Sequence, residues 1–244
     1  MTSTPRTTVG FITPTAGDSP HFTGFKALIP AEVHMDFEGL EVLRDYSLSS
    51  LEGSTDLILD RARSAVAARG WQGVIVSGAP LEILSPGLQE RLQAALPVPA
   101  TTALTACVAA LRSLRAERVL LLTPFDEAMN ERIAAYLADH GIQPTLPATA
   151  FSQIAEAMRL APEEVRRHAL TALAAAGDVQ AIYFQGAVLD PLPVLDTLES
   201  EINLPVVASN PAMLWYILSR LGLRYSIPGH GRLLREWPAL ATPG

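Results

Sequence analysis

The feature that most constrains the fold of this 244-residue chain is an internal repeat. Residues 73–82 (GVIVSGAPLE) have a counterpart in residues 181–190 (AIYFQGAVLD), which places Gly78 and Gly186 108 residues apart. Two further matches follow in the same order at offsets of 108 and 110 residues, namely 96–101 with 204–209 and 9–14 with 119–124. The repeat predicts two similar halves, related by duplication, that pack as one body.

Each copy of the repeat predicts a buried strand followed by a helix. The apolar run is typical of a parallel strand covered on both faces, and the Gly-Ala-x-Leu-acid sequence after it indicates a helix start. Further predicted strands and helices alternate along the chain. The predicted strands are 9–13, 33–37, 74–76, 97–102, 119–122, 181–184 and 206–208. The predicted helices are 54–69, 88–96, 104–115, 129–140, 162–176, 194–201 and 212–221.

This alternation predicts an α/β fold with two pseudo-symmetric halves, each a parallel sheet flanked by helices. We assign residues 1–112 and the C-terminal tail 212–244 to the first half, and residues 113–211 to the second. We expect a site between the halves, with residues 46–53 as a loop overhanging it. Residues 225–234 are expected to form a loop as well.

Composition argues against several classes of partner. The formal net charge is −7 and Lys26 is the only lysine, so we expect no nucleic-acid partner. No signal peptide or membrane-spanning run is visible, which favours a cytoplasmic protein without a membrane partner. The single cysteine, Cys107, rules out an intrachain disulfide. Metal-ligand spacing, a phosphate-binding glycine loop and a Ser-His-Asp pattern are all missing, so we expect no metal and no cofactor. The oligomeric state is left open.

The carboxyl ends of the predicted strands carry small, neutral side chains. Ligands of parallel sheets bind beyond these ends, where the amides of helix starts favour an anion such as a carboxylate. Such residues are also ordinary in turns and helix caps, but their presence at six ends favours a binding site. The candidate ligand-binding residues are Thr13, Pro14, Ser77, Gly78, Ala79, Thr123, Phe125, Gln185, Gly186, Ala187 and Ser209. Thr101, Thr102, Pro124 and Asn210 occupy the same strand ends.

Four segments carry a resemblance to a known family. They are TTALTACVAAL at 101–111, NERIAAYL at 130–137, LPVVASNPA at 204–212 and PGHGRLL at 228–234. Together with the duplicated architecture, they resemble the arylmalonate decarboxylase and maleate isomerase branch of the aspartate/glutamate racemase superfamily over nearly the whole chain. The resemblance implies a cofactor-independent lyase or isomerase that acts on a small carboxylic acid.

The resemblance also shows where this chain departs from the family. Family racemases use one cysteine in each half as acid and base, and the decarboxylase keeps only the second; the matching positions are Gly78 and Gly186. Two-cysteine racemisation and cysteine addition to a double bond are therefore excluded. Cys107 lies in an apolar helix and is interpreted as a buried structural thiol. In the implied carboxylate pocket, Phe125 replaces a tyrosine and residues 79–80 (Ala-Pro) replace a hydroxyl pair.

Other groups are candidates for the missing proton carriers. Glu82 and Asp190 each follow a repeat glycine by four residues, so they could share acid and base roles or simply stabilise helix starts. His34, in the second predicted strand, could approach the site or be structural. We take Glu82 and His34 as the candidate catalytic residues. His230 is interpreted as a packing residue. The histidines interpreted as surface or loop residues are His21, His140 and His168.

Two functions follow from these observations. The first is a cysteine-independent lyase or isomerase for a malonate- or maleate-like acid, for example a decarboxylase in which desolvation of a carboxylate promotes loss of carbon dioxide. The second is a catalytically silent sensor or accessory protein that binds a carboxylate, which glycine at both cysteine positions favours. Substitution of Gly186 by cysteine is expected to create decarboxylase or racemase activity if the pocket is intact.

Overall fold

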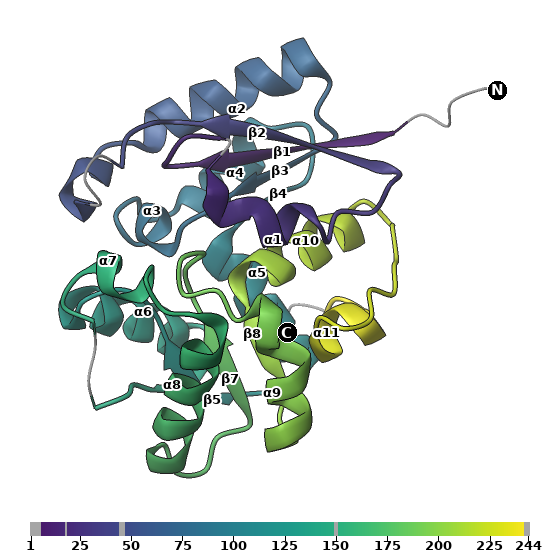
Figure 1. The fold of residues 1–244 in the computed structure, drawn as a ribbon. Coiled ribbons are helices and arrows are strands. Elements are labelled where there is room, and N and C mark those ends of the chain that lie inside the picture. The colour runs from purple at the N-terminus through teal and green to yellow at the C-terminus, as the bar shows by residue number, and fades with distance from the viewer. Residues whose placement is uncertain (1–5, 18, 44–46, 149–150, 242–244) are drawn as a thin grey trace.

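The two copies of the repeat form two parallel sheets in the computed structural model, which describes residues 6–17, 19–43, 47–148 and 151–241. Within these residues each sheet has four strands, in the order β2-β1-β3-β4 and β6-β5-β7-β8 (Figure 1). The predicted α/β fold of two halves is confirmed. The strands are β1 (Thr7–Thr13), β2 (Val33–Gly39), β3 (Gly73–Val76), β4 (Ala100–Thr102), β5 (Arg118–Leu122), β6 (Gln143–Thr145), β7 (Ala181–Phe184) and β8 (Val206–Ala208).

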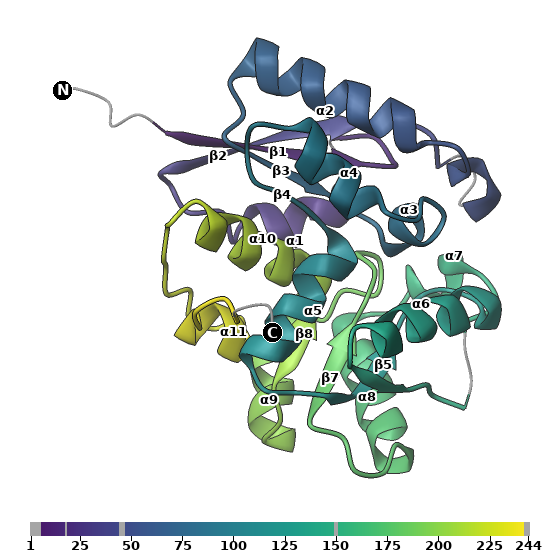
Figure 2. The same ribbon diagram turned by 180° about the vertical axis from the view of Figure 1, so that it is seen from behind.

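Helices cover the sheets and separate the halves, as Figures 1 and 2 show. In the first half they are α1 (Thr23–Lys26), α2 (Thr55–Arg69), α3 (Ala79–Ile83), α4 (Leu88–Ala95) and α5 (Ala103–Ser113), with 3-10 helices η1 (Pro20–Phe22) and η2 (Leu48–Leu51). Later in the chain they are α6 (Glu127–Asp139), α7 (Ile154–Ala157), α8 (Pro162–Ala175), η3 (Leu192–Val194), α9 (Leu195–Ile202), α10 (Ser209–Arg220) and α11 (Gly231–Glu236). The predicted strands and helices are present, with ends that differ by at most three residues.

The second copy of the repeat does not open a helix after its glycine, which corrects the prediction. Residues 186–190 form a turn, and helical structure begins only at η3. The Asp190 carboxylate accepts a hydrogen bond from the Leu192 backbone N–H at 3.0 Å, which stabilises the turn. Pro191 and Pro193 also lack the N–H that a continuing helix would need.

Part of the tail that was predicted as a loop forms helix α11. The Arg232 backbone N–H donates to Glu199 Oε2 at 2.5 Å, so a carboxylate of α9 satisfies the start of α11. Gly231 permits the close approach, because a β-carbon built there would lie 2.0 Å from Leu195 Cδ2. The Pro-Gly-His-Gly-Arg sequence therefore docks the tail on the second half.

Helices α5 and α10 lie between the two sheets (Figure 2) and pack against each other. Helix α10, which follows the last strand of the second sheet, also contacts β3 and β4 of the first sheet. Helix α5 follows the first sheet and contacts β8 of the second. The larger of two apolar clusters contains residues of both halves, so the halves form a single body. The exact boundaries given above stay a prediction. No helix in the described ranges is long and apolar enough to cross a membrane.

Candidate functional site

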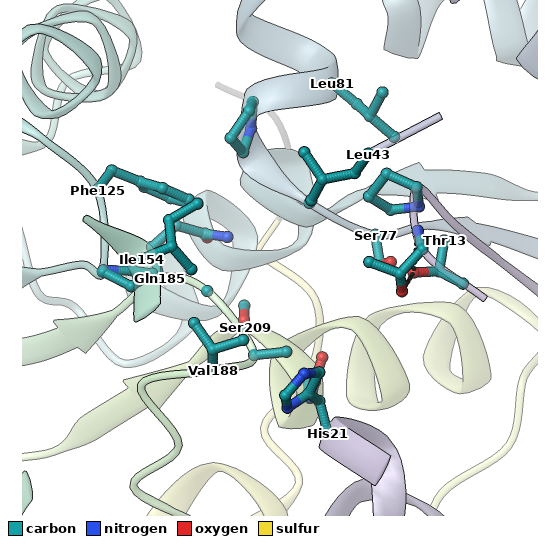
Figure 3. A pocket seen from close by; sticks show the side chains of 18 of the residues that line it. Thr13, His21, Leu43, Ser77, Leu81, Phe125, Ile154, Gln185, Val188 and Ser209 are labelled. Atoms are coloured by element: carbon teal, nitrogen blue, oxygen red, sulfur yellow. Dashed lines mark hydrogen bonds between the residues drawn. The ribbon is translucent and has the colours of Figure 1, made fainter. Parts of the chain in front are cut away.

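A cavity of about 90 Å³ lies where the carboxyl ends of the two sheets meet (Figure 3). Residues that follow β1, β3, β5, β7 and β8 contribute to its wall, as expected for parallel strands. The predicted ligand-binding residues that line it are Thr13, Pro14, Ser77, Gly78, Phe125, Gln185, Gly186, Ala187 and Ser209, joined by Pro124 and Asn210. The repeat therefore brings most of the predicted site together from both halves.

Four residues at the strand ends do not belong to the described cavity lining. Ala79 is fully buried in α3. The Thr123 hydroxyl donates to Asn130 Oδ1 and accepts from the Phe125 N–H at 3.1 Å, so it ties the turn after β5 to α6. Thr101 is also fully buried, and Thr102 caps α5 by accepting the Thr105 N–H at 3.3 Å. The Thr102 and Thr123 hydroxyls are thus engaged in hydrogen bonds at a helix start and a turn rather than in the cavity.

An apolar wall completes the cavity and was missed by the sequence reasoning. Leu48 and Leu51 come from η2, which lies in the predicted overhanging loop, of which residues 47–53 are described. Ile154 comes from α7 in the second half. The other unpredicted lining residues are Thr15, His21, Phe22, Leu43, Pro80, Leu81, Val188 and Met213. Most belong to irregular segments, where no periodicity reveals which side chains point inward.

His21 lies in the cavity wall, which corrects its interpretation as a surface or loop residue. It belongs to η1, and Figure 3 shows its ring among the lining side chains, opposite Leu81. Among the described lining residues it is the one side chain that titrates near neutral pH. Burial lowers the pKa of His21 below its usual value, so the neutral imidazole dominates at pH 7.

The two predicted proton carriers lie elsewhere. Glu82 is buried in α3, and its Oε1 accepts hydrogen bonds from the Tyr136 hydroxyl at 2.8 Å and the Thr105 hydroxyl at 3.3 Å. Burial raises the pKa of Glu82. His34 is exposed on β2, where it pairs with Thr8. Neither residue is part of the described cavity lining, and their catalytic role stays a prediction.

Gln185 combines a place in the cavity wall with a fixed side-chain amide. Its Oε1 accepts hydrogen bonds from the Tyr183 hydroxyl and from the Cys107 thiol, whose sulfur lies 3.9 Å away. Its Nε2 is buried and has no hydrogen-bond partner among the described groups. Cys107 is buried as predicted, and burial raises the pKa of its thiol to about 12. The thiol therefore stays protonated and acts as a donor rather than a nucleophile.

The remaining titratable groups give no sign of a metal centre. Across the described ranges, no three His, Cys, Asp or Glu residues are grouped so that they could hold a metal ion. His140 stacks on Tyr136 with 4.2 Å between ring centroids, and His168 contacts Phe151. His230 precedes α11 and is half-buried, consistent with packing.

Comparison with known proteins agrees with the fold. The chain matches the arylmalonate decarboxylase family over residues 9–234. It belongs to the arylmalonate decarboxylase family. Arylmalonate decarboxylase of Bordetella bronchiseptica is 33% identical over 141 residues, which are 57% of this chain and 59% of that protein. Maleate isomerase of Nocardia farcinica (strain IFM 10152) is 33% identical over 140 residues, 56% of this chain and 55% of its own length.

The structural likeness extends further than the sequence matches, which span little more than half of those two relatives. A crystal structure of arylmalonate decarboxylase superposes with a TM-score of 0.78 at 26% identity, covering 94% of this chain and 99% of that one. The resemblance inferred from the four sequence segments is therefore confirmed. The two relatives from Bordetella bronchiseptica and Nocardia farcinica are named as a decarboxylase and an isomerase.

Gly78 and Gly186 are the two positions that the resemblance matches with the cysteines of the racemases, of which the decarboxylase keeps only the second. Gly78 and Gly186 both line the cavity and have positive φ angles of 96° and 112°. A β-carbon built on Gly78 would lie 3.5 Å from Pro14 Cγ, an ordinary contact. One built on Gly186 would lie 2.7 Å from Pro124 Cδ, closer than real β-carbons approach. The described lining thus contains no thiol, and the second glycine position has no room for one.

Proposed function

We propose that this protein is a cysteine-independent lyase or isomerase that binds a small malonate- or maleate-like acid between its halves. The observation that carries the proposal is the make-up of the cavity: neutral hydrogen-bonding groups, an apolar wall and a single imidazole in the described lining. The small volume favours a compact acid. Membership of a family whose named relatives act on arylmalonates and maleate supports the same substrate class.

One carboxylate of the substrate would be held by neutral donors. Ser209 lies at the first turn of α10, a twelve-residue helix whose free backbone amides favour an anion. Ser77 and Asn210 add a hydroxyl and an amide to the lining. None of the described lining residues is a lysine or arginine, so the bound carboxylate keeps most of its charge. A second carboxylate would face the apolar wall, where lost hydration destabilises it.

In a decarboxylation, the bond between the second carboxylate carbon and the α-carbon breaks, and its electron pair moves to the α-carbon. Carbon dioxide leaves, and the bound carboxylate shares the charge as an enediolate. A proton must then reach the α-carbon, and we assign its delivery to protonated His21, which regains a proton from solvent. His21 is favoured over Glu82 and His34 because it is the one of the three that lines the cavity.

Proton NMR in deuterated water tests this proposal with a panel of malonate, methylmalonate, phenylmalonate, maleate, aspartate and glutamate. We expect carbon dioxide loss or isomerisation for at least one acid, with solvent deuterium at the reacting carbon. His21→Gln should lower turnover about a hundredfold or more, since general acids contribute that much. Turnover should rise as the pH falls below about 6.5, because the pKa of His21 is lowered and its protonated form delivers the proton.

His168→Gln is the matched control for His21→Gln. His168 is also half-buried with a pKa lowered by burial, but it lies outside the described cavity lining, so turnover should persist. Normal turnover in His21→Gln would return the proton-carrying role to Glu82 or His34, and Glu82→Gln and His34→Gln would distinguish them.

The alternative is a catalytically silent carboxylate-binding protein. It is favoured by the glycines at both cysteine positions and by Phe125, which has no hydroxyl in the cavity wall. Binding of an acid without turnover of any member of the panel would establish this alternative and contradict the enzyme proposal.

A further inference from the structure

In the side-chain amide of Gln185, the oxygen is hydrogen-bonded to protein groups and the nitrogen is not. Gln185 lines the cavity, yet only 1% of its surface is exposed. Its Oε1 accepts two hydrogen bonds, whereas its buried Nε2 has no partner among the described groups. Buried amide donors are almost always satisfied in folded proteins. An unsatisfied donor in a cavity wall points to a ligand atom as its partner.

The orientation of this amide is set by two donors from different elements. The Tyr183 hydroxyl approaches from β7 of the second half, and the Cys107 thiol approaches from α5 of the first half. Burial raises the pKa of both groups, so both keep their protons at neutral pH. If the amide were reversed, its NH₂ group would need the Tyr183 hydroxyl and the Cys107 thiol as acceptors, and a thiol accepts only weakly. The two contacts therefore favour the orientation that leaves Nε2 for a ligand.

We propose that Gln185 Nε2 donates a hydrogen bond to a carboxylate oxygen of the bound acid, and that Tyr183 and Cys107 hold the amide in this orientation. This inference rests on the proposed function and names the recognition group of the same cavity. Gln185 is then a binding residue, while Tyr183 and Cys107 are positioning residues. An amide of fixed direction selects a hydrogen-bond acceptor without neutralising its charge.

The experiment measures the dissociation constants of malonate and maleate by calorimetry for the wild type and three variants. Gln185→Glu keeps the shape and the contacts of Oε1 but places an acceptor where Nε2 was. Affinity should fall about a hundredfold, and Gln185→Leu should lose about tenfold, as expected for a hydrogen bond to a charged group. Tyr183→Phe releases one of the two donors that hold the amide and should weaken binding about threefold.

Gln89→Glu is the matched control, because Gln89 is a buried glutamine whose amide is bonded on both sides. Its Nε2 donates to the Ala100 carbonyl at 3.0 Å and its Oε1 accepts the Thr102 N–H at 3.0 Å. Gln89→Glu should lower the melting temperature without changing acid affinity. Gln185→Glu should weaken binding with a smaller change in melting temperature, which a purely structural role would not produce.

A measurement on the unaltered protein removes the dependence on variants that fold poorly. With ¹⁵N-glutamine labelling, the Gln185 side-chain NH₂ resonance should shift on addition of the acid, while the Gln89 resonance should not. Unchanged affinity in both Gln185 variants, or an unshifted resonance when the wild type binds, overturns the inference and leaves the proposed function standing. A wild type that binds no acid overturns both.

Discussion

Gly78 and Gly186 occupy matching positions in the two halves, but their surroundings differ. Both follow a central strand, both line the cavity, and both have positive φ angles. Beside Gly78, Pro14 leaves space for a β-carbon at ordinary contact distance. Beside Gly186, Pro124 fills the space that a side chain would need. The repeat has kept the backbone of the two positions alike while the volume around them has diverged.

This difference shows that the two glycine positions are not equivalent in the space they offer to a side chain. In the first half, a β-carbon at position 78 meets no steric obstacle beyond its backbone conformation. In the second half, the Pro124 ring occupies the space that a β-carbon on Gly186 would need. The Gly186→Cys variant expected from the sequence to restore activity would therefore disturb packing first, and Gly78→Cys is the cleaner test of thiol chemistry.

The largest effect that tests the comparison is on stability. Gly78→Cys should lower the free energy of unfolding by about 1–3 kcal/mol, because a non-glycine residue is strained at positive φ. Gly186→Cys should lose a further 1–3 kcal/mol or so through overpacking against Pro124. Urea denaturation measures both values. Pro124→Ala added to Gly186→Cys should recover part of the loss, and equal losses in the two single variants would contradict the comparison.

Glu82 and Asp190 extend the comparison to charge. Glu82 accepts hydrogen bonds from two hydroxyls, whereas the hydrogen bond given to Asp190 comes from a backbone N–H. Burial raises the pKa of Asp190 from 3.8 to about 6, so folding favours its neutral form. The stability that this provides is complete below about pH 3.8 and is lost as the pH rises through about 6.

Asp190→Asn should therefore raise the free energy of unfolding by up to about 3 kcal/mol at pH 8, with a gain that shrinks as the pH falls toward about 4. Glu82→Gln should gain less, because the Tyr136 and Thr105 hydroxyls already compensate for part of the cost of the buried charge. Denaturation at several pH values measures both variants. A pH-independent change in Asp190→Asn would show that the carboxyl is not preferentially neutral in the folded protein.

The smallest expected effect concerns the helices that follow β4 and β8. Thr102 and Asn210 are equivalent in the repeat, but α10 begins at Ser209, so Ser209 and Asn210 line the cavity while Thr102 caps α5. Thr102→Ala should cost about 1 kcal/mol of stability, as the loss of an N-cap does, and leave acid binding unchanged. Ser209→Ala should weaken acid binding and change the unfolding free energy by less than about 0.5 kcal/mol. The reverse pattern would place the binding surface on β4.

The repeat explains how much of the molecule could be predicted from the sequence. Buried strands reveal themselves as apolar runs, and their carboxyl ends locate the site in a parallel sheet. Edge strand β6, with the sequence Gln-Pro-Thr, carries no such run and was missed. The position of a residue at a strand end does not determine where its side chain points. Thr123 was therefore predicted in the cavity, but its hydroxyl donates to Asn130 instead. His21 became recognisable only when tertiary packing placed η1 against the cavity.

The fully buried Cys107 makes the rate of thiol modification a measure of how often the two halves open. It is the only cysteine in the sequence, and it sits in α5 beside Gln185. A thiol reagent cannot reach it in the closed molecule, and burial that raises its pKa to about 12 keeps the reactive thiolate from forming. The rate at which a thiol reagent modifies the native protein therefore measures how often the shared core opens. The rate of Cys107 modification thus reports the opening of the packing that also holds the Gln185 amide.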